Sequence, residues 1–133
     1  MEEQKESASG SLESNKAIAL GFLQAIVAGD VARVEALIDP EATWWVQGWG
    51  TFDRDSFVTS LLGTIDRSSL RKMEILYATA EEDRVAIAAQ GEFLFAEGAY
   101  CNSYHYLFTL ANGRLIAGRE YMDTSIAARF FAA

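Results

Sequence analysis

The sequence has few of the residues that build metal, redox or nucleotide sites. Cys101 is its only cysteine and His105 its only histidine, which excludes an intrachain disulfide and the usual zinc ligand sets. None of the patterns HExxH, GxGxxG, GxxxxGK[ST] or GxSxG occurs. We therefore expect no metal and no cofactor, and neither a dinucleotide nor a nucleoside triphosphate as ligand.

Basic residues and long apolar runs are also scarce. Lys and Arg number 11 against 19 Asp and Glu, a net charge of −8. A domain this acidic repels phosphate groups, so we expect neither nucleic acid nor a membrane as partner. The longest unbroken apolar run, Val85–Ala89, is far too short to span a bilayer. The polar N-terminus MEEQKESASGSLE is unlike a secretory signal, and we expect a cytoplasmic protein.

The length and composition fit one globular domain. The chain has 133 residues, of which 50% are hydrophobic, 12% aromatic and 23% charged. This composition is too apolar for a disordered chain, and the length suits a single core. Residues 1–13 show no apolar periodicity, so we expect a flexible tail there and a single domain over residues 14–133.

Apolar residues at helical spacing predict two helices at the start of this domain. Ser14 caps the first helix, which ends at Gly29; Asp30 caps the second, which Pro40 ends. The aromatic-rich residues 41–50 then predict a strand and an irregular turn.

A third helix and a meander of strands follow. Asp53 or Asp55 caps the helix, and from Leu70 the apolar residues alternate with a period of two. The predicted strands cover residues 70–80, 85–95, 100–110 and 114–121. A tight turn at Asn112-Gly113 joins the last two strands, and Asp123 caps a short final helix.

This order of elements predicts an α+β fold. An order of helices first and an antiparallel meander after them is typical of α+β folds, in which the helices cover one face of the sheet. The predicted strands are longer than usual, which favours a strongly curved sheet. Gly91 and Gly118 lie in mid-strand, where a bulge or bend would let the sheet coil. We expect a cone-shaped antiparallel sheet closed by three N-terminal helices, with an open mouth.

Polar residues on the inner face of the cone are the candidates for chemistry, because that face is normally apolar. One face of the strand at 100–110 carries Tyr100, Asn102, Tyr104, Tyr106 and Phe108. A two-residue turn would place Arg119 opposite Tyr106, whereas a longer turn or a bulge would bring Glu120 to this set. The pattern leaves both registers open.

The segments NSYHYLFTL and NGRLIAGREYMDT resemble the C-terminal signature of SnoaL-like proteins in the nuclear transport factor 2-like superfamily. The order of helices and strands agrees from Ser14 onward, so the resemblance covers nearly the whole chain. It implies the cone fold, a small-molecule cavity and a homodimer formed through the curved sheet. Superfamily members include ketosteroid isomerases, polyketide cyclases, limonene epoxide hydrolase, dehydratases and proteins without known catalysis.

The resemblance to limonene epoxide hydrolase implies roles for five positions. Glu120 matches the aspartate that activates water in that enzyme, and Glu92 is a looser match for its second carboxylate. Gln90 falls at its arginine. Trp45 and Gln47 fall at the tyrosine and asparagine that position the water. Replacement of the arginine and the tyrosine argues against epoxide opening by that arrangement.

Glu120 is the leading catalytic candidate. In an apolar cavity its pKa would rise toward neutrality, which suits a group that removes a proton or activates water. The alternative is an exposed glutamate paired with Arg119 or Arg114. Tyr104 and Tyr106 are candidate donors to a developing oxyanion; the alternative is that they simply pack in the core.

Further candidates surround this group. Asn102 either orients a substrate oxygen or satisfies a loop backbone. Residues expected to form cavity walls, or else a large core, are Trp45, Trp49, Phe57, Leu61 and Met122. Trp44 should point away from Trp45, toward a subunit contact, and His105 should lie on the outer face of the sheet.

Together these features predict a small cofactor-independent enzyme that performs acid–base chemistry on a hydrophobic cyclic ligand. Isomerisation, cyclisation, dehydration and hydrolysis fit the same residues. The alternative is a ligand-binding or protein-docking protein without catalysis.

Overall fold

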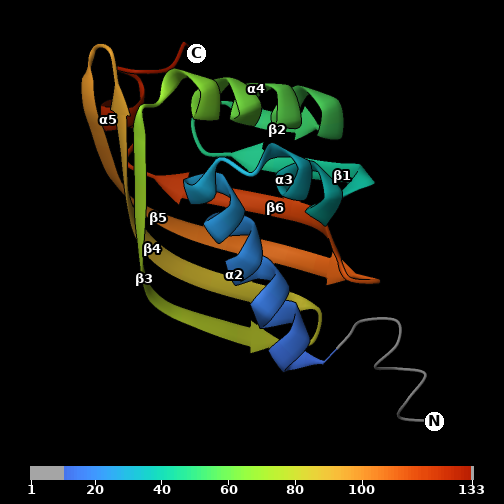
Figure 1. The fold of residues 1–133 in the computed structure, drawn as a ribbon. Coiled ribbons are helices and arrows are strands. Elements are labelled where there is room, and N and C mark those ends of the chain that lie inside the picture. Colours follow the sequence, from blue (N-terminus) through green and yellow to red (C-terminus); the bar gives the residue numbers. More distant parts are fainter. Residues whose placement is uncertain (1–10, 133) are drawn as a thin grey trace, which may run out of the picture.

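The computed structural model describes residues 11–132, in which two helices, two strands and a third helix precede a run of four strands and a short last helix (Figure 1). Most of the predicted tail therefore lies outside the described residues. The elements are α2 (Leu12–Ala28), α3 (Val31–Leu37), β1 (Ile38–Val46), β2 (Gly50–Asp53), α4 (Arg54–Arg67), β3 (Leu70–Glu81), β4 (Arg84–Phe95), β5 (Gly98–Ala111), β6 (Arg114–Met122) and α5 (Thr124–Ala127). The predicted α+β class is confirmed.

One six-stranded sheet, in the order β2-β1-β6-β5-β4-β3, forms the body of the protein. The sheet is strongly curved and open; α2 lies across its inner face, and α4 lies beside β1 and β2 (Figure 1). The expectation of a purely antiparallel sheet is wrong in one place, because β1 pairs with β6 in parallel. This pairing joins the N-terminal half of the chain to the end of the meander. It also sets residues 44–46 beside residues 118–120.

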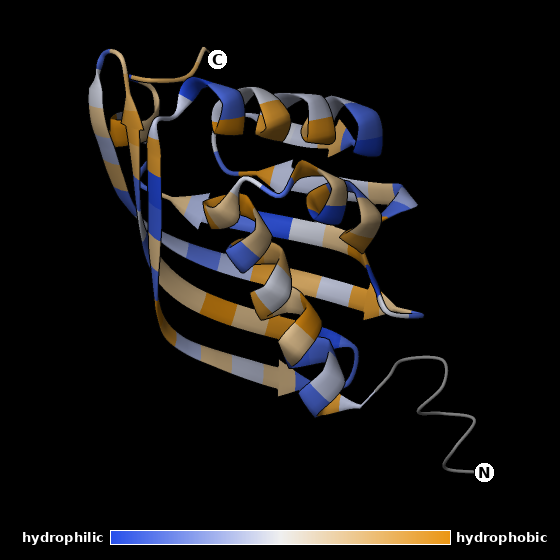
Figure 2. Cartoon of the chain, in the orientation of Figure 1, coloured by the Kyte–Doolittle hydropathy of each residue, from blue (hydrophilic) through white to orange (hydrophobic). Residues whose placement is uncertain are grey.

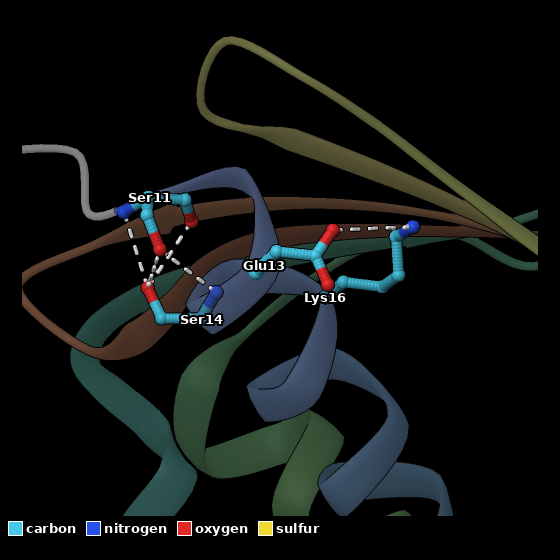
Figure 3. A network of polar contacts seen from close by, with 4 residues as sticks. All are labelled: Ser11, Glu13, Ser14 and Lys16. Atoms are coloured by element: carbon cyan, nitrogen blue, oxygen red, sulfur yellow. Dashed lines mark hydrogen bonds and ion pairs between the residues drawn. The ribbon is translucent and has the colours of Figure 1, made fainter.

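The N-cap of helix α2 lies three residues before the predicted cap, Ser14. Ser11, not Ser14, is the N-cap: its hydroxyl accepts a hydrogen bond from Ser14 N, and the Ser14 hydroxyl accepts one from Ser11 N (Figure 3). Lys16 lies 3.9 Å from Glu13 on the same turn. The two serines form a capping box in which Ser14 is the third helical residue, so both orphan N–H groups are satisfied.

The other helix ends follow the predicted signals. Asp30 caps α3, Asp53 caps α4 and Asp123 caps α5, each by accepting backbone N–H groups. Gly29 ends α2 with a φ of 71°, a conformation that glycine adopts without steric cost.

Strand β1 begins at Ile38, within the segment predicted as the second helix. Pro40 therefore lies inside a strand. Its missing N–H is tolerated because residues 39–42 bulge between two paired segments of β1 and β6. The predicted irregular turn after β1 is followed by the short strand β2.

Two β-bulges shape the sheet. Leu110 pairs with Leu115 and Thr109 with Ala117, so Ile116 is the extra residue in β6; Leu76 is the corresponding extra residue in β3. The Asn112-Gly113 turn keeps its predicted two-residue form, with positive φ at both residues. The bulge in β6 therefore shifts every pair beyond it by one position.

The sequence predicts bulges at the mid-strand glycines, Gly91 and Gly118, but the bulges lie elsewhere. A Cβ atom at Gly91 would be 3.0 Å from the Tyr104 ring, and one at Gly118 would overlap the Trp44 indole. These glycines instead admit large aromatic side chains to the inner face of the sheet.

The core fills the space between the sheet and the helices. Figure 2 shows hydrophobic and hydrophilic residues alternating along the strands, as expected for a sheet with one face covered. Among the largest fully buried side chains are Trp44, Phe22, Phe108, Leu23, Ile38 and Ile87. Trp44 is only 1% exposed, so the expectation that it reaches a subunit contact is wrong.

Candidate active site

A cavity of about 370 Å³ opens within the curve of the sheet. Strands β4, β5 and β6 supply one wall, helix α4 supplies another, and α5 with the residues after it adds a third. Its lining includes Trp49, Phe57, Leu61, Met73, Phe93, Tyr100, Tyr104, Tyr106, Glu120, Met122 and Phe131. This volume and this largely apolar lining suit a small hydrophobic ligand.

The β6 bulge decides which residue of that strand faces the cavity. Beyond Ile116, Tyr106 pairs with Glu120 and Tyr104 pairs with Met122. Glu120 therefore lies on the inner face, while Arg119 is exposed on the outer one. Of the two registers that the sequence leaves open, the structure has the one that brings Glu120 to the tyrosines.

Glu120 is the only acidic or basic residue among those that line this cavity in the described part of the chain. The indole Nε1 of Trp44 donates a hydrogen bond to its Oε2 at 2.7 Å. Trp44 is held in turn by Phe57 of α4, whose ring stacks on it at a centroid distance of 4.3 Å. The core thus fixes one carboxylate oxygen, while no described residue bonds to Oε1.

Burial raises the pKa of the Glu120 carboxyl group from its ordinary 4.5 to about 7, against the opposing effect of the Trp44 hydrogen bond. An apolar environment disfavours the charged carboxylate, and a donor that bonds to it favours the charge. Near neutral pH, Glu120 is therefore available both as an acid and as a base.

Three tyrosines of β5 face the same cavity. The Tyr104 hydroxyl donates a hydrogen bond to the Tyr100 oxygen at 2.9 Å, and Asn102 Nδ2 donates to the same oxygen at 3.0 Å. Tyr104 and Tyr106 stack with centroids 5.3 Å apart. Burial raises the pKa of all three phenols, so each stays protonated at neutral pH and can donate a hydrogen bond.

Asn102 is directed at the protein and not at the cavity. Its Oδ1 accepts from Asp123 N at 3.0 Å, and its Nδ2 donates to Asp123 O at 2.9 Å. Asn102 is 7% exposed and is not part of the lining. It ties β5 to the start of α5, so the interpretation as a backbone-satisfying residue fits its contacts.

Several predicted wall residues do lie along the cavity: Trp49, Phe57, Leu61 and Met122. Trp49 also donates its indole N–H to Ala132 O at 2.6 Å, which holds the C-terminal residues against the cavity. Whether these residues bind a substrate stays a prediction.

Trp45 does not line the cavity, and its prediction as a wall is wrong. It lies on the outer face, where the Arg119 guanidinium is 4.1 Å from its ring centroid and Tyr121 packs beside it. The parallel pairing of β1 with β6 determines which face of the sheet each β1 side chain occupies, so Trp44 points inward and Trp45 points outward.

Gln90 and Glu92 are also absent from the cavity. Their positions alternate with the inner-face residues of β4, and both border a second hollow at β3, β4, β5 and α5, whose lining includes Lys72, Glu74, Cys101, Asn102, Ser103 and Asp123. Gln47 has a backbone role, since its Oε1 accepts from Met122 N at 3.0 Å. The expected second carboxylate is therefore not beside Glu120.

Tyr100 lines the cavity although the sequence analysis did not single it out as a site residue. It belongs to the period-two set of β5, so the alternation places it on the inner face. Its hydrogen bonds with Tyr104 and Asn102 could not be read from that pattern, because alternation gives the face of a side chain and not the positions of its polar atoms.

Within residues 11–132, no group of three or more His, Cys, Asp or Glu residues is placed to hold a metal ion. None of the helices described there is long and apolar enough to cross a membrane.

A family model described as the SnoaL-like domain matches residues 19–118. The chain belongs to this family. The predicted placement in the nuclear transport factor 2-like superfamily is thereby confirmed. No curated protein matches this SnoaL-like chain at a significant level.

Solved structures share the fold of this SnoaL-like protein at low sequence identity. An LEH-like epoxide hydrolase from M. tuberculosis is 16% identical with a TM-score of 0.78, and 89% of each chain is covered. BvnE pinacolase from Penicillium brevicompactum is 14% identical with a TM-score of 0.80, covering 89% of this chain and 88% of that one. Bal32a, from a soil-derived mobile gene cassette, is 21% identical with a TM-score of 0.79, covering 90% and 97%.

Proposed function

We propose that this SnoaL-like protein is a cofactor-independent enzyme that transfers a proton on a hydrophobic cyclic substrate, with Glu120 as the proton-transfer group. The observation that carries the proposal is the position of Glu120. Its carboxyl group borders an apolar cavity and has a pKa of about 7. A general acid or base works best when its pKa lies near the working pH.

The hydrogen bond from Trp44 supports this role. It occupies Oε2 and leaves Oε1 to exchange a proton with the ligand. The apolar lining favours a ring compound over a charged metabolite. The epoxide hydrolase and the pinacolase named above share the fold and support enzymatic activity in this family.

The lining also bears on the reaction type. Gln90 and Glu92 do not line the cavity, whose described lining has one carboxylate and no arginine. This disfavours a two-carboxylate epoxide opening. Isomerisation, cyclisation and dehydration need only one acid–base group beside a hydrogen-bond donor.

The decisive experiment measures proton transfer directly. The protein is incubated in D₂O with a steroid ketone, a monoterpene epoxide and a polycyclic polyketide, and products and deuterium incorporation are measured by mass spectrometry. Turnover of at least one compound is expected, and Glu120→Gln should reduce it by roughly 10²–10⁴-fold.

Glu92→Gln is the matched control, because it makes the same change on the outer face and should keep wild-type turnover. Equal rates for wild type and Glu120→Gln would refute the proposal. Tight binding without any turnover would favour the alternative, a ligand-binding protein.

Two features of the proposal do not depend on the cavity. We propose a homodimer formed through the outer face of the sheet, where Trp45, Arg119 and Tyr121 pack together. We also propose a cytoplasmic location. Analytical ultracentrifugation and fractionation of cells test them.

A further inference from the structure

Both ends of the Asn102 amide are occupied by its own chain. Asp123 N–H donates to Oδ1 at 3.0 Å, and because a backbone N–H can only donate, the orientation of the amide is unambiguous. The two hydrogens of Nδ2 then go to Asp123 O at 2.9 Å and to the Tyr100 oxygen at 3.0 Å. Asn102 therefore has no donor left for a ligand, and it holds the Tyr100 hydroxyl in place.

The Tyr100 oxygen accepts a second hydrogen bond, from the Tyr104 hydroxyl at 2.9 Å. A phenol oxygen can accept two hydrogen bonds and donate one. In this arrangement Tyr100 accepts two hydrogen bonds, and among residues 11–132 no hydrogen bond is found that its own hydroxyl donates. Tyr100 is only 2% exposed and it lines the cavity, so bulk water does not surround this hydroxyl.

A buried donor without a partner is costly, and such groups in folded proteins have a partner or a function. We propose that Tyr100 donates its hydrogen bond to an acceptor oxygen of the substrate, which makes Tyr100 a specificity-determining residue. The substrate class is then a hydrophobic ring compound with a carbonyl or ether oxygen. This inference rests on the proposed function, since it takes the cavity to be the substrate site.

Asn102 and Tyr104 are positioning residues in this arrangement. Each donates a hydrogen bond to the Tyr100 oxygen. These two bonds fix the direction of the Tyr100 O–H and strengthen it as a donor. Glu120 lies on the neighbouring strand and lines the same cavity. A bound ring can therefore have its oxygen at Tyr100 while another atom meets Glu120.

Two probes of matched shape test the proposal, the bicyclic ketone 1-tetralone and its hydrocarbon tetralin. Tyr100→Phe should weaken the binding of 1-tetralone by roughly five- to tenfold, the loss expected for one hydrogen bond, and leave tetralin binding unchanged. Tyr77→Phe is the matched control: it removes the hydroxyl of an exposed tyrosine of β3 that does not line the cavity, and it should change neither affinity.

The infrared carbonyl stretch of bound 1-tetralone reports the hydrogen bond itself. It should lie at lower frequency in wild type and in Tyr77→Phe than in Tyr100→Phe. A stretch in wild type no lower than in an apolar solvent would overturn the assignment without any variant. Loss of the shift in Tyr104→Phe but not in Tyr100→Phe would overturn it as well.

The experiment separates this inference from the proposed function. Glu120→Gln should retain the Tyr100-dependent carbonyl shift. If that variant also turned over substrate at the wild-type rate, the acid–base role would fall and the oxygen-binding role of Tyr100 would stand.

Discussion

The indole N–H of Trp44 donates to Oε2 of Glu120 at 2.7 Å, across the parallel pair of β1 and β6. Trp44 belongs to the fully buried core, whereas Glu120 borders the cavity. This single contact couples the packing of the protein to the protonation of its cavity carboxylate.

Trp44→Phe should raise the pKa of Glu120 above its value of about 7. The Trp44 hydrogen bond favours the ionised carboxylate, so its loss favours the protonated form. The titration is followed by NMR of ¹³C-labelled glutamate, with Glu120→Gln identifying the resonance. Trp45→Phe makes the same change on the outer face and should leave the titration unaltered; an unchanged pKa in Trp44→Phe would contradict the argument.

The stability of the protein should fall as the pH rises, in a way that Glu120→Gln removes. Below pH 4.5 Glu120 is protonated in both the folded and the unfolded states. Between pH 4.5 and about 7 the unfolded state releases the proton while the folded state retains it, so the free energy of unfolding falls by roughly 3 kcal/mol.

Urea denaturation at pH 4 and pH 8 measures this effect as the difference between wild type and Glu120→Gln. All other titrating groups are shared by both proteins and cancel in the comparison. The free energy of unfolding of Glu120→Gln, taken relative to wild type, should be roughly 3 kcal/mol higher at pH 8 than at pH 4. A difference that does not change with pH would show that Glu120 is not buried.

Gly118→Ala should be strongly destabilising. A Cβ at this position would overlap the Trp44 indole, and Trp44 is too well buried to move aside. We expect a cost of ~1–3 kcal/mol in the free energy of unfolding, together with a shift in the Glu120 titration. Gly63→Ala is the control, because a Cβ there meets nothing within 4 Å, and it should be neutral or slightly stabilising.

Arg71→Met should destabilise the junction of two helices with the sheet. The Arg71 guanidinium donates to Val27 O, Ile65 O and Ser68 O at 3.0–3.2 Å, at the C-terminal ends of α2 and α4. Losing these charge-assisted hydrogen bonds should cost about 3 kcal/mol in thermal or urea unfolding. Arg84→Met removes only exposed ion pairs with Glu82 and Asp83 and should unfold like wild type.

The sequence predicted most elements because their signals are local. Asp30, Asp53 and Asp123 each cap the helix that follows, and Asn112-Gly113 forms the expected tight turn. The predicted cap of the first helix, Ser14, lies three residues after the true one, because Ser11 and Ser14 both fit a cap and only the reciprocal hydrogen bonds identify Ser11. Strand β2 and the parallel pairing of β1 went unpredicted, because they depend on contacts between segments far apart in the chain.

The sequence by itself determined the fold class, the order of elements and the set of β5 residues that share a face, since these follow from periodicity and from caps and turns within a few residues. Only the tertiary structure decided that Glu120 faces the cavity, that Trp44 and not Trp45 turns inward, and that Gln90 and Glu92 turn outward. The physical reason is that side chains alternate along a strand. One extra residue at Ile116, and one register between β1 and β6, therefore determine which members of each alternating set meet.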